Sequence, residues 1–298
     1  MLSAHDHVMQ RDKLHPDGPE ISRLVAGVWR WHTVSPETVD RLVRTALDQG
    51  ISTFDHADIY GDHGNEEIFG QVLKKQPALR AQMELVTKCG IKLVSGKRPA
   101  TRLKHYDTTR AHVTWSVDHS LAALGTDYLD LLLIHRPDPL LNPAELAETF
   151  ADLKQQGKVL HVGVSNFTPS QFDVLQQALD FPLVTNQIEI SLSRVDPLFN
   201  GDLDNLMLHR VRAMAWSPLG GGKRVGDERD WFAMAARHNA SYSQLALAWL
   251  MQHPSGIFPI IGTTQPDRIV ESAKALSIQL DRQDWFEMLR WATGREVA

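Results

Sequence analysis

Short apolar runs that end abruptly in polar residues recur along this chain, and they constrain its fold more than any other feature. Four of them read Phe54-Asp55-His56-Ala57-Asp58-Ile59-Tyr60-Gly61, Leu85-Val86-Thr87-Lys88, Leu131-Leu132-Leu133-Ile134-His135 and Val162-Gly163-Val164-Ser165-Asn166. Continuous apolar runs are typical of parallel strands, because a parallel sheet is buried on both faces. In a closed parallel barrel the carboxyl ends of the strands meet at one mouth, so we expect these polar residues to converge.

Helical periodicity fills the intervals between these runs. Ser35-Pro36-Glu37 has the pattern of an N-cap followed by proline, and apolar residues then fall on one face of a helix that ends at Gly50. Further pairs continue to a strand expected at 258–261 and complete eight strand and helix units, which fits one barrel of 298 residues. No G-x-G-x-x-G sequence follows a strand, so an open dinucleotide-binding sheet is not supported.

The sequence therefore predicts an α/β fold, an eight-stranded parallel (β/α)8 TIM barrel. The expected parts are a single domain over 1–298, an N-terminal cap or hairpin in 1–20, a first barrel strand at 21–25 and an added C-terminal helix at 285–292. The basic stretch between Cys89 and Thr108 is expected to form a loop over the mouth. Asp58 and His63 are expected to be solvated loop residues.

Charge and cysteine content exclude several classes of protein. The 31 Lys and Arg residues against 36 Asp and Glu give a net charge of −5, which offers no general attraction to nucleic acid or to an anionic membrane. No apolar run reaches the roughly 18 residues of a membrane span. Cys89 is the only cysteine, which favours a reducing, cytoplasmic location. We expect a small-molecule substrate and a monomer, although the sequence leaves an oligomer open.

Asp55, Tyr60, Lys88 and His135 are the candidate catalytic residues at the expected mouth. A tyrosine with a pKa of about 10 donates its proton poorly at neutral pH, but the ammonium of Lys88 stabilises the phenolate and lowers that pKa. Asp55 keeps Lys88 protonated in a desolvated site, and His135 can donate a hydrogen bond to a substrate oxygen. Together they suit the protonation of an oxygen that gains negative charge, as a carbonyl oxygen does when hydride arrives.

Such a reaction needs a hydride donor, and since no side chain supplies hydride, the site requires a nicotinamide cofactor. Ser165, Asn166 and Gln187 can hydrogen-bond to a carboxamide, and Trp216 offers a flat face on which a ring can stack. These residues follow the later strands and are expected at the same mouth.

The phosphates of such a cofactor need a separate region. The glycine-rich segment 217–222 provides flexible backbone for a pyrophosphate. After the last strand, Gly262-Thr263-Thr264 leads into a helix whose N-terminal amides favour phosphate, and Arg268 on its first turns can bind a ribose phosphate.

The chain resembles an aldo-keto reductase in ordered segments that cover nearly its whole length, namely FDHADIYG, VTKCG, LGTDYLDLLLIHRPD, KVLHVGVSNF, NQIEIS, AWSPLGGG and IIGTTQPDRIVES. The resemblance implies a catalytic tetrad of Asp55, Tyr60, Lys88 and His135, with Tyr60 as the proton donor. It implies nicotinamide contacts by Ser165, Asn166, Gln187 and Trp216. It also implies nucleotide contacts at Ser217, Leu219, Gly262, Thr263, Arg268 and Glu271, and a wall of the substrate pocket at Trp29.

Two positions depart from the family pattern. Relatives often carry lysine and asparagine where this chain has Gly262 and Ser272, so one phosphate-binding charge and one adenine contact are missing. Arg268 remains, and the resemblance therefore implies NADPH as the cofactor in preference to NADH. The expected function is the NADPH-dependent reduction of aldehydes or ketones to alcohols.

Two other functions remain as alternatives. A metal-dependent hydrolase could gather Asp55, His56, His63 and His135 at a barrel mouth. Barrels that resemble amidohydrolases usually begin with a His-x-His pair on the first strand, whereas this chain has Gly27-Val28-Trp29 there, and no metal site is expected. The second alternative is a catalytically silent NADPH-binding sensor or regulatory protein of the same fold, in which the catalytic set would be expected to decay.

Overall fold

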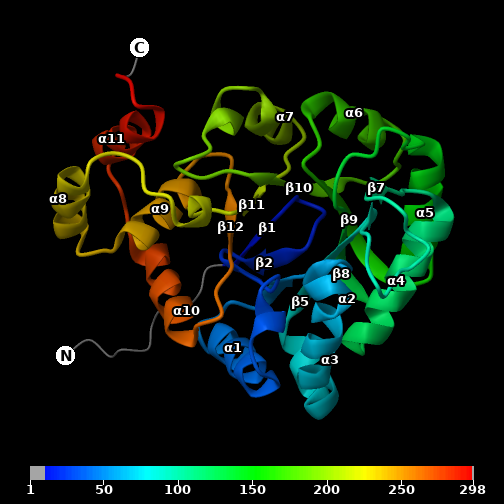
Figure 1. Ribbon diagram of the computed structural model, residues 1–298. Coiled ribbons are helices and arrows are strands. Elements are labelled where there is room, and N and C mark those ends of the chain that lie inside the picture. The colour runs from blue at the N-terminus through cyan, green and yellow to red at the C-terminus, as the bar shows by residue number, and fades with distance from the viewer. Residues whose placement is uncertain (1–10, 297–298) are drawn as a thin grey trace.

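Eight parallel strands close into a barrel at the centre of the computed structural model, which describes residues 11–296 (Figure 1). They are β3 (Val25–Gly27), β4 (Thr53–Asp55), β5 (Glu84–Cys89), β8 (Leu129–Ile134), β9 (Val159–Ser165), β10 (Leu183–Glu189), β11 (Met214–Trp216) and β12 (Phe258–Ile261). Around the barrel they pair in the order β10-β11-β12-β3-β4-β5-β8-β9, and every neighbouring pair is parallel. The predicted (β/α)8 barrel is confirmed.

Helices surround the barrel and connect its strands (Figure 1). They are α1 (Pro36–Asp48), α2 (Tyr60–His63), α3 (Asn65–Lys75), α4 (Arg110–Leu124), α5 (Pro143–Gln155), α6 (Pro169–Gln177), α7 (Asp202–Leu208), α8 (Glu228–His238), α9 (Tyr242–Met251), α10 (Pro266–Ala273) and α11 (Arg282–Thr293). Local sequence fixes several of their starts, because Ser35 caps α1 through Thr38 N, and Thr168 and Ser241 form capping boxes. The predicted C-terminal helix is α11.

A hairpin closes the amino-terminal end of the barrel. It consists of β1 (Arg11–Lys13) and β2 (Glu20–Ser22), which pair antiparallel. Leu14 and Ile21 are fully buried and join the apolar cluster that fills the barrel interior. The predicted N-terminal cap is therefore confirmed for residues 11–22, and residues 1–10 lie outside the described part of the chain.

One boundary differs from the sequence prediction. The first barrel strand is Val25–Gly27 and not 21–25, because Ile21 is buried as part of the hairpin that plugs the barrel and not as part of its wall. Between 228 and 251 the chain forms two helices, α8 and α9, since Asn239 adopts a left-handed conformation with φ 46° and ends α8.

The stretch between Cys89 and Thr108 contains a short antiparallel pair, β6 (Ile91–Lys92) with β7 (His105–Tyr106). It leaves the carboxyl end of β5, at the same end of the barrel as Lys88. No helix within residues 11–296 is long and apolar enough to span a membrane.

Candidate functional site

Three neighbouring strands bring the four candidate catalytic residues to one end of the barrel. Asp55 is the last residue of β4, Lys88 lies near the end of β5, and His135 follows the last residue of β8. Tyr60 begins α2, in the connection that leaves β4. Because β4 pairs with β5 and β5 pairs with β8, the parallel pairing of these strands brings residues 80 positions apart in sequence to the same end of the barrel.

Lys88 is fully buried, and its ammonium group uses all of its hydrogen-bond donors. Nζ donates to Asp55 Oδ2 at 2.7 Å, to the His56 carbonyl oxygen at 2.7 Å and to Tyr60 Oη at 3.1 Å. An ammonium has three N–H donors, so none is left over. Tyr60 Oη accepts a hydrogen bond from Lys88, and its own O–H remains available to donate to another group.

Burial alone would lower the pKa of Lys88, but Asp55 and Tyr60 together raise it above its usual value. Lys88 therefore keeps its positive charge inside the protein. Asp55 is held on its other side as well, because Gln187 Nε2 donates to Asp55 Oδ1 at 2.8 Å. The carboxylate of Asp55 is thus fixed by one charged donor and one neutral donor.

The pKa of Tyr60 is raised, mainly by burial, although Lys88 acts to lower it. The expectation that Lys88 brings this pKa below its ordinary value is therefore wrong for the free protein, because desolvation of the phenolate outweighs the ammonium charge. Tyr60 is consequently protonated at neutral pH. It holds a proton that it can give, and a cation already lies beside the oxygen that would become charged.

His135 lies against Tyr60, with the two rings edge to face and their centroids 5.8 Å apart. Burial lowers the pKa of His135 well below its usual value, and the charges of Lys88, Arg136 and Lys104 lower it further. Nδ1 is buried and has no hydrogen-bond partner among the described residues. His135 is therefore a neutral imidazole, which suits it to donate or accept a hydrogen bond without carrying charge.

Four polar residues at the ends of β9, β10 and β11 form a connected network. Ser165 Oγ donates to the carbonyl oxygen of Gln187 at 2.8 Å, and Asn166 Nδ2 donates to Ser165 Oγ at 2.7 Å. Trp216 Nε1 donates to Asn166 Oδ1 at 2.9 Å. The network fixes the orientation of the Trp216 indole, and Gln187 joins it to Asp55 and so to the buried Lys88.

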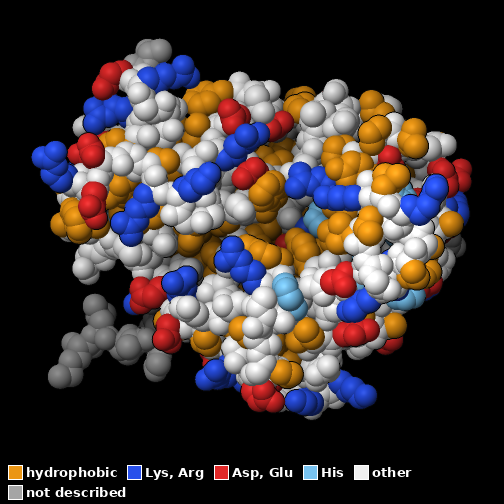
Figure 2. Space-filling model, viewed as in Figure 1, with side chains coloured by type: hydrophobic (Ala, Val, Ile, Leu, Met, Phe, Trp, Pro, Cys, Tyr) orange, Lys and Arg blue, Asp and Glu red, His pale blue; other side chains and the backbone are white. Residues whose placement is uncertain are grey.

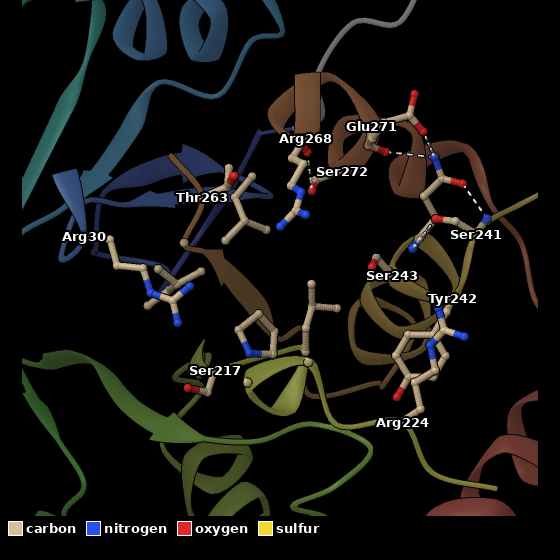
Figure 3. A pocket seen from close by; sticks show the side chains of 18 of the residues that line it. Arg30, Ser217, Arg224, Ser241, Tyr242, Ser243, Thr263, Arg268, Glu271 and Ser272 are labelled. Atoms are coloured by element: carbon tan, nitrogen blue, oxygen red, sulfur yellow. Dashed lines mark hydrogen bonds between the residues drawn. The ribbon is translucent and has the colours of Figure 1, made fainter. Parts of the chain in front are cut away.

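A cavity of about 570 Å³ opens between the ends of β11 and β12 and the first turns of α9 and α10 (Figure 3). The predicted nucleotide-contact residues that line it are Ser217, Leu219, Gly262, Thr263, Arg268 and Glu271. Its volume lies within the range of about 300–1,000 Å³ that is usual for ligand sites. The structure therefore brings these six residues together around one cavity.

Trp29 lies in the wall of this cavity, against Gly262. A Cβ atom built at Gly262 would lie 1.9 Å from Trp29 Cη2 and 2.0 Å from Cζ3, so the indole occupies the space of any side chain there. Trp31 ties the same two loops together, because its Nε1 donates to the Thr263 carbonyl oxygen at 2.9 Å. A side chain at position 262 would therefore require the Trp29 indole to move. A substrate-pocket role for Trp29 stays a prediction.

Three arginines surround the cavity, and only Arg268 was expected from the sequence. Arg30 and Arg268 point into it from different sides, while Arg224 lies beside Tyr242 (Figure 3). Within residues 11–296 none of the three guanidinium groups has a carboxylate partner at salt-bridge distance. Arg30 lies in the connection that leaves β3, a position that the strand-end pattern could have identified. Arg224 follows a glycine-rich turn that has no readable pattern.

The cavity suits a nicotinamide dinucleotide, because unpaired cations and the amino-terminal end of α10 face a space large enough for its phosphates. One predicted contact has other partners. The carboxylate of Glu271 accepts from Gln244 Nε2 at 3.0 Å and from Lys274 Nζ at 2.6 Å, so both of its oxygens are engaged within the chain.

Asp58 is not a solvated loop residue as expected from the sequence. Ser116 Oγ donates to its Oδ2 at 2.7 Å, and its Oδ1 is buried with no partner among the described residues. His63 also faces inward, since its Nδ1 lies 2.9 Å from the Asp58 carbonyl oxygen. Burial raises the pKa of Asp58 to about 7, although the Ser116 hydrogen bond opposes this. The turn that carries Tyr60 therefore rests on a buried carboxyl group.

Asp58→Asn is expected to change how stability depends on pH. Between about pH 4 and pH 7 the unfolded chain has lost the Asp58 proton while the folded chain keeps it, so the free energy of unfolding falls as pH rises. Asparagine does not titrate, so this fall is absent in the variant. From the low to the high end of this pH range, the free energy of unfolding of the variant should therefore rise relative to that of wild type by at most roughly 4 kcal/mol. Urea unfolding at about pH 5 and pH 8 measures the gain. Asp62→Asn is the control, and an equal gain there would contradict the assignment.

Within residues 11–296 no group of three His, Cys, Asp or Glu side chains is arranged to hold a metal ion. Two of the residues proposed for a hydrolase site have other surroundings. Asp55 is committed to Lys88 and Gln187, and His56 is fully buried against Phe69, with a pKa that burial lowers to about 3.

Comparison with known proteins places this chain in a family. A model described as the aldo/keto reductase family matches residues 23–290. The 6-dehydroglucose reductase of Agrobacterium fabrum is 46% identical over 97% of this chain and 100% of that protein, and Oxidoreductase YdhF of Escherichia coli is 45% identical over the same shares.

The fold is also similar to a solved structure. The crystal structure of the thermostable aldo-keto reductase Tm1743 in complex with the inhibitor epalrestat superposes with a TM-score of 0.83, at 26% identity, over 95% of this chain and all of that one. The barrel, the matched family model and the similarity along the whole length agree: this chain is an oxidoreductase of the aldo/keto reductase family.

Proposed function

We propose that the protein reduces aldehydes or ketones to alcohols with NADPH. One observation carries the proposal, namely that Lys88 Nζ donates its three hydrogen bonds to Asp55, His56 and Tyr60. This leaves Tyr60 with a free O–H beside a fixed positive charge and a neutral imidazole. A protonated phenol supported by a cation is suited to deliver a proton to an oxygen that becomes negatively charged.

In the proposed reaction the hydride for the carbonyl carbon would come from NADPH when it is bound. Tyr60 donates its proton to the carbonyl oxygen, and the charge of Lys88 stabilises the phenolate that remains. Asp55 keeps Lys88 charged and in position through the 2.7 Å contact. His135 donates a hydrogen bond to the same carbonyl oxygen and holds it near Tyr60.

The proposed cofactor contacts divide into two regions. Ser165, Asn166 and Trp216 would orient the nicotinamide, and Gln187 would contribute its amide oxygen because its Nε2 is bonded to Asp55. Ser217, Leu219, Gly262 and Thr263 would line the phosphate region, with Arg268 facing the ribose phosphate. Glu271 would act through Gln244 and Lys274, since its carboxylate is already engaged.

The relatives support an aldehyde as the substrate. Two of them, from Agrobacterium fabrum and Novosphingobium aromaticivorans, carry the name 6-dehydroglucose reductase and are 46% and 41% identical to this chain. Similarity at this level over nearly the whole chain favours related chemistry at the same mouth. We therefore propose small polar aldehydes as the first compounds to assay.

Cofactor oxidation in the presence of such aldehydes tests the function, and Arg268→Ala tests the choice of cofactor. Wild type should oxidise NADPH faster than NADH. The variant should lose roughly 10- to 100-fold in NADPH affinity, the range for a charge-assisted hydrogen bond, and much less in NADH affinity. Quenching of tryptophan fluorescence gives both dissociation constants.

Arg41→Ala is the matched control, because Arg41 is an exposed arginine on α1. Equal losses of NADPH and NADH affinity in Arg268→Ala would remove the phosphate role of Arg268. NADPH binding with no turnover of any aldehyde or ketone would instead favour a cofactor-binding sensor.

A further inference from the structure

Two cations that the proposed chemistry does not use act electrostatically on His135. Arg136 is the next residue after His135, and its guanidinium carbon lies 5.4 Å from the centre of the Trp216 ring. Lys104 comes from a different element, the loop between β6 and β7. The charges of both residues contribute to the lowered pKa of His135, and Arg136 also acts on Tyr60.

Neither cation is neutralised by its neighbours. Among residues 11–296 no carboxylate lies within salt-bridge distance of Arg136 or Lys104. The acid nearest to Arg136 in sequence is Asp138, and its oxygens accept from Thr108 N at 3.2 Å, from Thr108 Oγ1 at 3.0 Å and from Leu140 N at 2.9 Å. Asp138 therefore holds the loop and is not a partner for Arg136.

The position of Arg136 is also restricted. Its backbone follows His135, whose N–H donates to the Cys89 carbonyl oxygen at 2.8 Å, and its guanidinium lies over an indole that Asn166 fixes through a 2.9 Å hydrogen bond. Figure 2 shows Lys, Arg and His side chains beside the hollow at the centre of this face of the molecule. A half-buried guanidinium without an anion beside a catalytic histidine has five N–H donors for a ligand.

We propose that Arg136, assisted by Lys104, binds acceptor oxygens of the substrate, so that the preferred substrates are carbonyl compounds with hydroxyl or carboxylate groups close to the reacting carbon. This inference rests on the proposed function, because Tyr60 and His135 define where the carbonyl oxygen lies. Arg136 acts as a substrate-binding residue, and it selects polar aldehydes over alkyl aldehydes of equal length. Lys104, in the loop between β6 and β7, adds a second positive charge.

The test measures ratios of kcat/KM between substrates matched in chain length. Glyceraldehyde against propanal tests hydroxyl groups, and succinic semialdehyde against butanal tests a carboxylate. In wild type both ratios should exceed one. Arg136→Gln should lower at least one of them by about tenfold, as loss of a charged hydrogen bond predicts. The ratio that falls further identifies which oxygen chemistry the site prefers, and Lys104→Gln should lower the same ratio to a smaller extent.

Arg102→Gln is the matched control, since Arg102 is an exposed cation of the same loop as Lys104. Both ratios should stay at the wild-type value in this variant. Melting temperatures show that each variant is folded, and within residues 11–296 the Arg136 side chain makes no hydrogen bond that Arg136→Gln would remove. Unchanged ratios in folded Arg136→Gln would overturn the inference while leaving the proposed function intact. Absence of turnover by wild type with all four aldehydes would count against the proposed function itself.

Discussion

Replacement of Tyr60 by phenylalanine is expected to lower kcat for carbonyl reduction by roughly 10²–10⁴-fold, the usual contribution of a general acid. The variant keeps the ring that lies against His135 but loses the only proton that can be given at this position. NADPH affinity should change little, because the cavity that holds Arg268 is separate from the phenol. Steady-state oxidation of NADPH and a fluorescence titration measure the two quantities.

Tyr128→Phe is the control for this experiment. Tyr128 precedes β8 at the opposite end of that strand from His135, and its ring lies 3.9 Å from the guanidinium carbon of Arg80. Removal of the Tyr128 hydroxyl group should leave kcat close to the wild-type value. Full turnover by Tyr60→Phe would show that another group protonates the product.

Lys88→Met should abolish most turnover and also destabilise the fold. Removing one partner of a buried ion pair typically costs about 3–5 kcal/mol, because the other charge is left without compensation. Here that charge is Asp55, whose Oδ1 would retain only the hydrogen bond from Gln187. Urea unfolding measures the loss in the free energy of unfolding, and NADPH oxidation measures the loss of turnover.

The double variant Asp55→Asn with Lys88→Met separates the two effects. Asparagine keeps an oxygen that can accept from Gln187 Nε2, and it carries no charge that needs a partner. The double variant should therefore recover part of the lost stability and none of the lost turnover. If Lys88→Met alone were as stable as wild type, the buried pair would not have the energetic role described above.

The barrel and the convergence of the tetrad could be predicted because both follow from strand ends. An apolar run that stops at Asp55, Lys88 or His135 marks the carboxyl end of a parallel strand. The pairing of these strands in the barrel then brings the three residues to one end. The helices could also be located, because apolar periodicity and N-caps such as Ser35 are local features of the sequence. The assignment of roles to these residues, the single domain over 1–298, the monomer and the cytoplasmic location stay predictions.

The features that escaped prediction depend on contacts between distant segments. Asp58 is held by a hydrogen bond from Ser116 of α4, a residue 58 positions away in the sequence. The hydrogen bond from Gln187 to Asp55 crosses the barrel interior, and no local sequence pattern predicts it. The raised pKa of Tyr60 arises from the depth of its burial, which sequence reasoning set aside in favour of the neighbouring charge. Each of these is a property of packing.

The contact between Trp29 and Gly262 restricts how the cofactor site of this chain can change over time. A side chain at position 262 would meet the indole at position 29, so a lysine can enter at 262 only if Trp29 moves aside or is replaced. Loss of the tryptophan first would open the wall of the cavity before any new charge could compensate. The two positions are therefore expected to be epistatic, because the effect of a lysine at 262 depends on the side chain at position 29.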